Sequence, residues 1–341
     1  MTSRRTIPPP YFLTTALVAA ALGACTLLAP EQVNSSPTPA PSSSEASPTT
    51  TSARPSNVVL LVAAPTANTA LVAQLKQSLT DLSGSSQLSL QTMENVTAEQ
   101  LATGPRIVVV TGPDALAAAD PAGHPQIQFV AVGIPGLKPG PNLSLIGPDG
   151  PIPDQLGFLA GYLAALITPD YRVAAVSAGD TPSHVAASLA FLNGATFYCG
   201  LCRPTVPPFK TYPATFPITV DAATLQAEGI QTAFVTGDDA ATLERLAALG
   251  LDLIGNVAPP DAVRAKWIAT VVADPDPALR EIWQSLLEGQ GGRSLPLQPA
   301  LVDIRSGAVS PGRMRLLADT VAALTLGQID TAVDPATGQP R

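Results

Sequence analysis

An apolar run of eleven residues, Gly157 to Ile167, constrains the fold of this 341-residue chain more than any other stretch. The run carries no charge and no strongly polar side chain. A helix that spans a bilayer takes about 20 residues, so this shorter run indicates a helix buried in a protein core. Small residues, including Gly161 and Ala164, recur every three to four positions, which lets one helix face approach a neighbouring backbone closely. Asp154 is placed to cap the start of the helix, and Thr168-Pro169 ends it.

Strand-like and helix-like runs alternate along the chain on both sides of this helix. Strands are expected at residues 58–63, 107–110, 127–132, 173–176, 232–235, 251–254 and 298–304. Helices are expected at residues 71–82, 113–119, 154–167, 182–193, 239–249, 277–288 and 312–326. Such alternation is typical of parallel sheets covered by helices on both faces, so the predicted fold class is α/β.

The length of the ordered part favours two Rossmann-like lobes with a hinge over a single sheet. A Pro- and Gly-rich stretch, residues 133–153, looks like the first crossover between them. We expect lobe 1 at 57–148, completed by about 268–300, and lobe 2 at 149–267, completed by about 301–331, with a tail at 332–341. Ligands bind beyond the carboxyl ends of parallel strands, so two facing lobes would share a ligand cleft.

The N-terminal segment has the pattern of an export signal. Arg4 and Arg5 precede a short apolar stretch, and Leu22-Gly23-Ala24-Cys25 resembles a bacterial lipobox. We expect residues 1–25 to be a lipoprotein signal and Cys25 to be lipidated, which would anchor the protein at the outer face of the cell membrane. An ordinary secretory signal with a chance Cys is the alternative. Residues 26–56 are expected to be a disordered tether, because 17 of the 23 residues at 34–56 are Ser, Thr or Pro.

Composition and motifs exclude several classes of function. The net charge is −8, and the globular part has no basic cluster, which argues against a nucleic-acid partner. The chain has no Walker phosphate loop, no H-E-x-x-H motif and no G-x-S-x-G motif. His124 and His184 are the only histidines, which leaves little material for a histidine-based catalytic centre. We therefore expect a protein that is not an enzyme and that needs neither a cofactor nor a metal.

Four segments, in the right order, carry a resemblance to a known family. They are DQLGFLAGYLA (154–164), RVAAVSAGDTP (172–182), LAFLNGATFY (189–198) and GAVSPGRMRLLADTVAALTLGQIDT (307–331). Together they resemble the basic membrane lipoprotein family, the purine-nucleoside-receptor-like branch of type I periplasmic binding proteins. The resemblance implies a two-lobed binding protein that captures a small polar ligand, such as a nucleoside, and presents it to an ABC transporter permease.

The chain differs from the family at the positions that bind the ligand. The family follows its first strand with a loop whose Asp and aromatic residue take part in nucleoside binding. Here the loop at 63–69 has neither, and Thr66 and Asn68 are its candidate ligand residues. The family's later acid position corresponds in location to Asn256, so a ligand role for Asn256 is left open.

Other candidate ligand residues follow predicted strands, where cleft-facing loops belong. They are Thr111, Gly112, Asp180, Gly237 and Asp238. Short carboxylates and hydroxyls at such positions can bind the hydroxyls of a ribose-like ligand. The alternative for Asp180, Asp238 and the neighbouring Asp239 is helix capping, which strand-to-helix turns also favour.

Two aromatic residues are further candidates. Phe158 lies near the start of the apolar helix, where it could approach the cleft. Trp267 precedes a strand-like run after the Asn256 loop and could provide a stacking platform, with core packing as its alternative.

The Cys199-Gly200-Leu201-Cys202 motif allows three interpretations. Export to an oxidising compartment favours a structural disulfide between Cys199 and Cys202. A redox-active pair and half of a zinc site are the alternatives. For the whole protein, the leading hypothesis is a lipid-anchored solute-binding protein. A family member that has lost its ligand and acts as a surface interaction or sensory module is the second, and a thiol oxidoreductase is a remote third.

Overall fold

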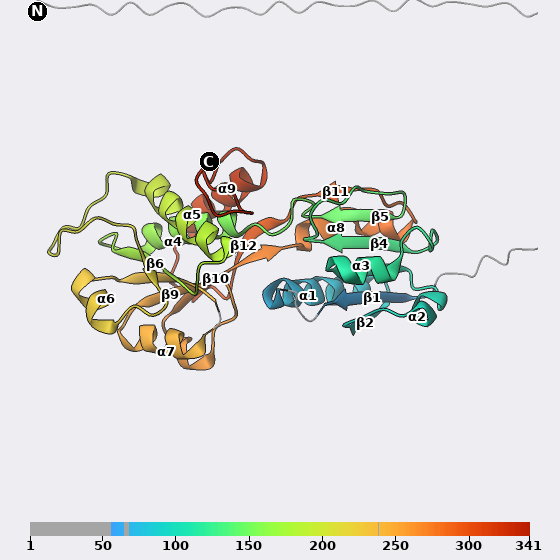
Figure 1. Cartoon of the computed structure of the whole chain (residues 1–341), viewed down its shortest axis with the longest axis horizontal. Helices are drawn as coiled ribbons and strands as arrows, with labels where there is room; N and C mark the ends of the chain where they lie inside the picture. Colours follow the sequence, from blue (N-terminus) through green and yellow to red (C-terminus); the bar gives the residue numbers. More distant parts are fainter. Residues whose placement is uncertain (1–55, 65–67, 238) are drawn as a thin grey trace, which may run out of the picture. The chain divides into compact units, whose positions relative to one another are not determined.

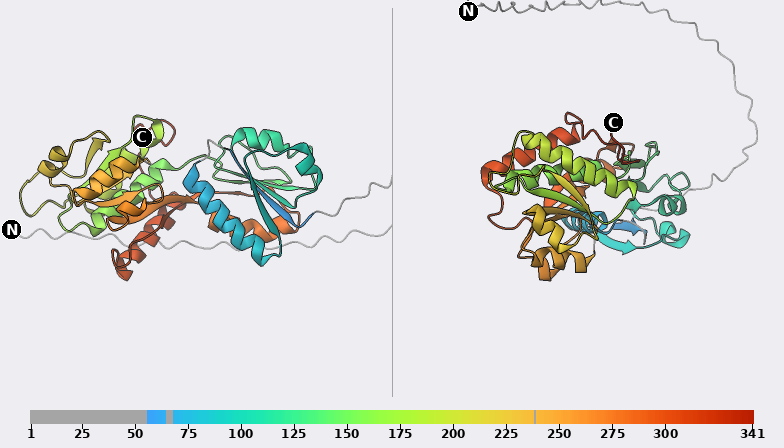
Figure 2. Two further views of the ribbon diagram at one scale, coloured as in Figure 1. Left: turned by 90° about the horizontal axis from the view of Figure 1, so that it is seen from below. Right: turned by 60° about the vertical axis from the view of Figure 1, so that its left-hand side comes forward.

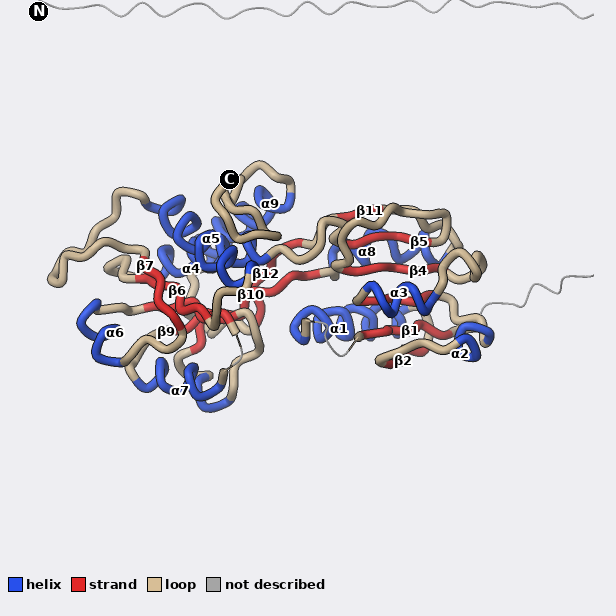
Figure 3. Tube along the Cα trace, viewed as in Figure 1, coloured by secondary structure: helices blue, strands red, loops and turns tan. Residues whose placement is uncertain are grey.

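The computed structural model describes residues 56–64, 68–237 and 239–341, which fold into two α/β lobes (Figure 1). Cys25, residues 26–55 of the tether, Thr66 and Asp238 lie outside the described residues. The predicted fold class is confirmed, because each lobe is built on its own six-stranded sheet in which most neighbouring strands are parallel. Figure 3 shows the two groups of strands in red.

The sheet of lobe 1 has the strand order β11-β5-β4-β3-β1-β2, and all its neighbouring strands are parallel. Its strands are β1 (Val58–Ala63), β2 (Ser89–Met93), β3 (Ile107–Thr111), β4 (Gln128–Val132), β5 (Leu143–Ile146) and β11 (Ser294–Leu295). Its helices are α1 (Thr69–Ser85), α2 (Ala98–Ala102), α3 (Pro113–Ala119) and α8 (Asp276–Leu287).

Alternating side chains of β1 explain why both faces of this sheet are covered. Val59 and Leu61 pack into a core formed with α1 and α8, whereas Leu60 and Val62 pack into a core formed with α2 and α3. Successive side chains of a strand point to opposite faces, so a strand that is apolar throughout requires a layer of helices on each side. Two further views are given in Figure 2.

The sheet of lobe 2 has the order β12-β10-β9-β8-β6-β7, with β12 antiparallel to β10 and the other pairs parallel. Its strands are β6 (Val173–Ser177), β7 (Ala214–Pro217), β8 (Thr232–Thr236), β9 (Asp252–Gly255), β10 (Trp267–Asp274) and β12 (Gln298–Val302). Its helices are α4 (Pro153–Ile167), α5 (Pro182–Cys199), α6 (Ala222–Glu228), α7 (Ala240–Ala248) and α9 (Pro311–Thr325), with a 3-10 turn at Asp261–Val263. Helices α4, α5 and α9 cover one face, and α6 and α7 cover the other.

The crossovers between the lobes differ from the expected boundaries. β5 lies inside the stretch that was expected to cross over, so the first crossover shrinks to residues 147–152. The return into lobe 1 contains only α8 and β11, because β10 pairs with β9 and β12 in the sheet of lobe 2. The chain therefore passes between the lobes at three places, before α4, between β10 and α8, and between β11 and β12.

The apolar helix α4 packs against α5 with glycine at the contact. A Cβ atom on Gly157 would lie 2.0 Å from the carbonyl oxygen of Ala187, and one on Gly161 would lie 2.0 Å from that of Phe191. Gly194 on α5 meets the backbone of α4 in the same way, 2.0 Å from the carbonyl oxygen of Phe158. The expected close approach of one helix face to a neighbouring backbone is thus confirmed. No helix in the described part of the chain is long and apolar enough to cross a membrane.

Candidate functional site

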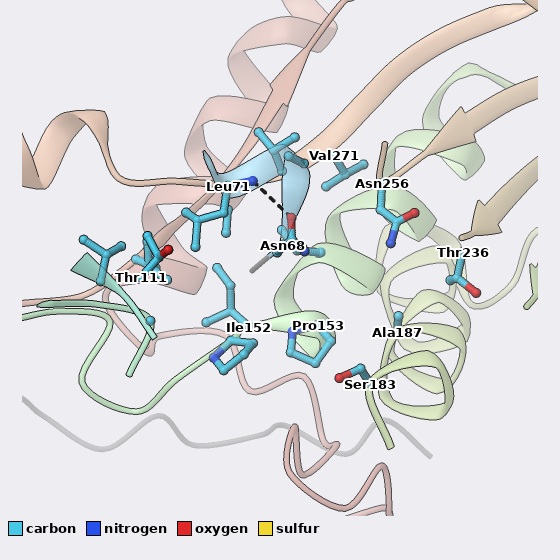
Figure 4. Close-up of a pocket in the computed structure, with 18 of the residues that line it drawn as sticks. Asn68, Leu71, Thr111, Ile152, Pro153, Ser183, Ala187, Thr236, Asn256 and Val271 are labelled. Carbon is cyan, nitrogen blue, oxygen red and sulfur yellow. Dashed lines mark hydrogen bonds between the residues drawn. The ribbon is translucent and has the colours of Figure 1, made fainter. Parts of the chain in front are cut away.

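A cavity of about 310 Å³ lies between the lobes and is drawn in Figure 4. Lobe 1 contributes residues at the carboxyl ends of β3 and β4, including Thr111 and Val132. Lobe 2 contributes Thr236 at the end of β8 and Asn256 directly after β9. This is the edge at which open parallel sheets bind ligands, so the position agrees with the expected cleft.

Four helices begin at the cavity. The start of α1 provides Asn68, that of α3 Gly112 and Pro113, that of α4 Pro153, and that of α5 Ser183 and His184. Backbone N–H groups in the first turn of a helix have no partner inside the helix, and the helix dipole adds a partial positive charge there. The cavity therefore has hydrogen-bond donors supplied by the backbone as well as by side chains.

The two asparagines on the lining each use one side-chain atom to fix their own loop. The Oδ1 atom of Asn68 accepts the backbone N–H of Leu71 at 3.0 Å and caps α1. The Oδ1 atom of Asn256 accepts the backbone N–H of Gly237 at 3.1 Å. With the oxygen engaged, the remaining donor of each amide is the Nδ2 group. Figure 4 shows both side chains at the cavity, one from each lobe.

Two further polar atoms on the lining are buried without a hydrogen-bond partner among the described residues. They are Oγ1 of Thr111 and Nδ1 of His184. Buried polar atoms normally find a partner, since leaving one unsatisfied costs about 1–3 kcal/mol. Both atoms can therefore bind a polar group of a ligand or of a water molecule in the cavity.

The rest of the lining is mostly aliphatic. Leu71, Ile134, Ile152, Leu156, Val271 and Leu297 surround the cavity, together with Phe234. The described lining residues include no Asp, Glu, Lys or Arg. The cavity thus combines apolar walls with a few neutral hydrogen-bonding groups, an arrangement typical of small-molecule sites.

The structure places the sequence-predicted residues at different distances from this cavity. Asn68, Thr111, Gly112 and Asn256 line it. Gly237 is not part of the lining, but its backbone N–H donates to Oδ1 of Asn256 and so orients that side chain.

Asp180 is exposed and is not part of the lining. It is not the cap of α5 either, because Thr181 accepts the backbone N–H of His184 in that role. Asp239 does cap its helix, α7, where its carboxylate accepts the N–H of Thr242 at 3.1 Å.

Both aromatic candidates are core residues in the structure. Phe158 is 2% exposed, and its ring packs 5.4 Å from that of Phe197. Trp267 is 1% exposed, lies against Gly255, and donates its Nε1–H to Oγ1 of Thr270 at 3.0 Å. The absence of a Cβ on Gly255 makes room for the indole ring, so Trp267 turns inward instead of forming a stacking platform.

Several lining residues were not singled out from the sequence. His184 lies in the first turn of α5, close to the predicted Asp180, and Thr236 is the last residue of β8, directly before the predicted Gly237. Ile152 and Leu297 lie on the crossovers, and no local pattern in the sequence marks them as cavity residues.

The Cys199–Cys202 disulfide expected from the sequence is present, with the two Cα atoms 5.4 Å apart. It closes the end of α5, whose opposite end borders the cavity. No group of three or more His, Cys, Asp or Glu side chains in the described part of the chain is placed to hold a metal ion.

Comparison with known proteins gives matches in structure only. No protein-family model matches the chain, and no curated protein matches it. An ABC transporter solute-binding protein from Conexibacter woesei is similar, with a TM-score of 0.62 and 17% identity over 80% of this chain and 97% of that chain. A second solute-binding protein, from Aeropyrum pernix, has a TM-score of 0.53 and 14% identity over 80% and 92%.

A transcriptional activator of the comK gene from Bacillus halodurans is equally similar in fold, with a TM-score of 0.53 and 16% identity over 80% of this chain and 98% of that chain. Because these neighbours have different roles, the likeness identifies the fold alone. The chain has the two-domain α/β fold of type I periplasmic binding proteins, which it shares with solute-binding proteins of ABC transporters.

Proposed function

We propose that this protein is an extracytoplasmic solute-binding protein, lipid-anchored at Cys25, that captures a small neutral solute and delivers it to an ABC transporter permease. Binding would close the two lobes over the solute, as hinged two-domain proteins do. The basic membrane lipoprotein family remains our hypothesis for its closer relatives, with nucleosides as the first solutes to test.

The observation that carries the proposal is the cavity between the lobes. It lies at the carboxyl ends of both sheets, and its lining offers Nδ2 of Asn68 and Asn256 and polar atoms of Thr111 and His184 that have no hydrogen-bond partner among the described residues. An interaction module that had lost its ligand would be expected to fill this space with its own side chains. The cavity therefore supports solute binding over the degenerate alternative.

The lining favours a neutral solute. An ion that enters a largely apolar cavity loses its hydration, and this loss is unfavourable unless a charge of opposite sign compensates it. The described lining residues include no Asp, Glu, Lys or Arg that could do so, and the four helix starts at the cavity supply partial charges only. Thr66 and Asp238 are proposed as further ligand residues, and a carboxylate at position 238 would suit the hydroxyl groups of a neutral solute such as a nucleoside.

A thermal-shift experiment with matched pairs of solutes tests the proposal. Each pair consists of a neutral compound and its charged counterpart, for example adenosine and adenosine 5′-monophosphate, or a neutral sugar and its phosphate. A solute at 100 times its Kd stabilises the folded protein by about 2.7 kcal/mol, so the melting temperature should rise by several degrees. We expect a rise with the neutral member of at least one pair and none with its charged partner.

Two results would decide against the proposal. A rise with the phosphorylated compounds but with no neutral compound would reject the neutral-solute assignment. No rise with any nucleoside would reject the nucleoside version, while leaving other neutral solutes to be tested in the same way.

A further inference from the structure

The loop between α5 and β7, residues 200–213, together with the last turn of α5, concentrates exposed apolar side chains. Six large apolar residues in the described part of the chain are exposed, and four of them lie here: Phe197, Leu201, Val206 and Phe209. Leu201 is 91% exposed and Phe209 is 71% exposed. Single exposed apolar residues are ordinary, but a group of them on one loop marks an interaction site.

A buried ion pair contacts the backbone of this loop and holds it in place. Asp170 and Arg172 are 7% and 6% exposed, and Nε of Arg172 lies 2.9 Å from Oδ2 of Asp170. Asp170 accepts the backbone N–H of Thr205 at 2.6 Å and its hydroxyl at 3.0 Å, and Arg172 donates to the carbonyl oxygen of Val206.

The two ends of the loop are fastened as well. The Cys199–Cys202 disulfide closes its start, and Tyr212 near its end donates its hydroxyl to the carbonyl oxygen of Glu228. Buried charges, a disulfide and a buried tyrosine thus hold a loop whose apolar side chains point outward.

The charge of this surface is opposite to that of the whole protein. The chain carries a net charge of −8, yet residues 181–220 contain no Asp or Glu. Arg203 and Lys210 are exposed beside Leu201 and Phe209, and Lys210 forms one ion pair, at 2.6 Å with Glu228. The partner of this loop should therefore combine an apolar interior with an anionic surface.

The loop is also remote from the cavity. It joins the end of α5 to the start of β7, whereas the cavity lies at the opposite, carboxyl ends of the parallel strands. In Figure 1 it is the yellow-green segment that projects at the left edge of the molecule. A contact made by this loop leaves the entrance of the cavity free.

We propose that this loop is a membrane-contact site, in which Leu201 and Phe209 enter the interfacial region of a bilayer that contains anionic lipid. Arg203 and Lys210 then lie at the level of the phosphate groups. Apolar and aromatic side chains next to basic ones, in a segment that itself contains no Asp or Glu, are the composition of segments that lie in a membrane interface. The proposal depends neither on the solute nor on the lipid at Cys25.

A fluorescence experiment on the full chain tests it. The two native tryptophans, Trp267 and Trp283, are 1% and 5% exposed, so a tryptophan introduced at an exposed position gives a separate signal. We compare Phe209→Trp with Leu326→Trp, because Leu326 is 70% exposed and thus matches Phe209 but lies just after α9. Each variant is mixed with phosphatidylcholine vesicles that either contain or lack phosphatidylglycerol, with and without bromine on the acyl chains.

We expect the emission of the Phe209→Trp variant to shift to shorter wavelength with phosphatidylglycerol vesicles and to lose intensity when the acyl chains are brominated. The Leu326→Trp variant should show neither change. Adding Arg203→Glu and Lys210→Glu to the Phe209→Trp variant should reduce both effects, and so should 1 M salt, which shortens the Debye length to about 3 Å.

Two outcomes would overturn the proposal. One is emission from the Phe209→Trp variant that stays at the exposed wavelength and unquenched with both kinds of vesicle. The other is equal quenching of the Phe209→Trp and Leu326→Trp variants, which would show that the N-terminal segment brings the whole surface near the bilayer without insertion of this loop.

Discussion

At the scale of single residues, two side chains that line the cavity each form a hydrogen bond to the backbone and keep a second polar group for the solute. Asn68 caps α1 with Oδ1 and is left with Nδ2 as a donor at the cavity. Asn256 is fixed in the same manner by Gly237. In both residues the hydrogen bond to the backbone orients the amide before any solute arrives, which lowers the entropic cost of binding.

Asn68 allows the two roles to be separated by substitution. Asp caps helices as well as Asn, so Asn68→Asp should leave the free energy of unfolding unchanged within a few tenths of a kcal/mol. It removes the Nδ2 donor, so affinity for the neutral solute found in the thermal-shift panel should fall by about 1–3 kcal/mol. Asn68→Ala should lose both affinity and about 1 kcal/mol of stability. Titration calorimetry and urea unfolding measure the two quantities, and unchanged affinity in Asn68→Asp would limit Asn68 to capping.

Asp170 makes the stability of lobe 2 depend on pH. The hydrogen bond from the backbone N–H of Thr205 and the nearby Arg172 hold the pKa of Asp170 below its ordinary value. A carboxyl group whose pKa is lowered by folding stabilises the protein above its unfolded pKa, and this contribution is lost as the pH falls through the folded value. Asp170→Asn should therefore reduce the urea midpoint near neutral pH and leave it closer to wild type in acid.

The control for this prediction is Glu94→Gln, a substitution of an exposed acid just after β2. It should follow the wild-type curve of urea midpoint against pH. If the difference between wild type and Asp170→Asn were the same from neutral to acid pH, the lowered pKa would not contribute to stability.

At the scale of helices and strands, much of the fold could be predicted because buried elements carry strong patterns. The strand at 58–63 and the helix at 154–167 were expected within a residue, since β1 is apolar throughout and the interior of α4 is fully buried. β2, β5, β7, β11, α2 and α6 were missed. β2 and β7 are the edge strands next to β1 and β6, with half-exposed residues and no apolar run, and α2 is only five residues long.

The candidate site was predicted only in part, because some of its residues follow a strand and others lie on crossovers that no local pattern marks. Residues that directly follow strands, such as Thr111 and Asn256, could be found because the carboxyl ends of parallel strands share one edge. Ile152 and Leu297 come from crossovers, and their positions depend on how far β5 and β11 extend. Trp267 turned inward because Gly255, on the neighbouring strand, leaves space that no pattern around residue 267 reveals.

The contact between α4 and α5 leads to a prediction for the helix pair. Gly161→Ala would place a methyl group 2.0 Å from the carbonyl oxygen of Phe191, so the two helix backbones must move apart. Overpacking of this kind lowers the free energy of unfolding by about 1–3 kcal/mol, and backbone atoms yield less readily than side chains. Gly312→Ala on α9, where a Cβ would meet nothing within 4 Å, is the control.

Gly312→Ala should be neutral or should stabilise by up to about 1 kcal/mol, because Ala restricts the unfolded chain and favours the helix. Urea unfolding of both variants gives the comparison. Equal stability of Gly161→Ala and wild type would show that α4 and α5 can separate without loss of packing.

At the scale of the whole molecule, the two attachments to the membrane that we propose differ in physical nature. A lipid at Cys25 would hold the protein by buried acyl chains, which salt does not affect. The loop at 200–213 would contribute a contact that depends on Arg203 and Lys210 and weakens as salt screens their charge. A wash at high salt therefore separates the two contributions.

Replacing Cys25 tests the lipid anchor under these conditions. After a wash in 1 M salt, where the Debye length is about 3 Å, we expect wild-type protein in the membrane pellet and Cys25→Ala in the supernatant. Detergent should release the wild-type protein from the pellet. The double variant Cys199→Ser with Cys202→Ser is the control for loss of cysteine as such, and it should stay in the pellet because its Cys25 is intact. Cys25→Ala protein that remains in the washed pellet would contradict a lipid at this residue and would point to the apolar stretch before it as the anchor.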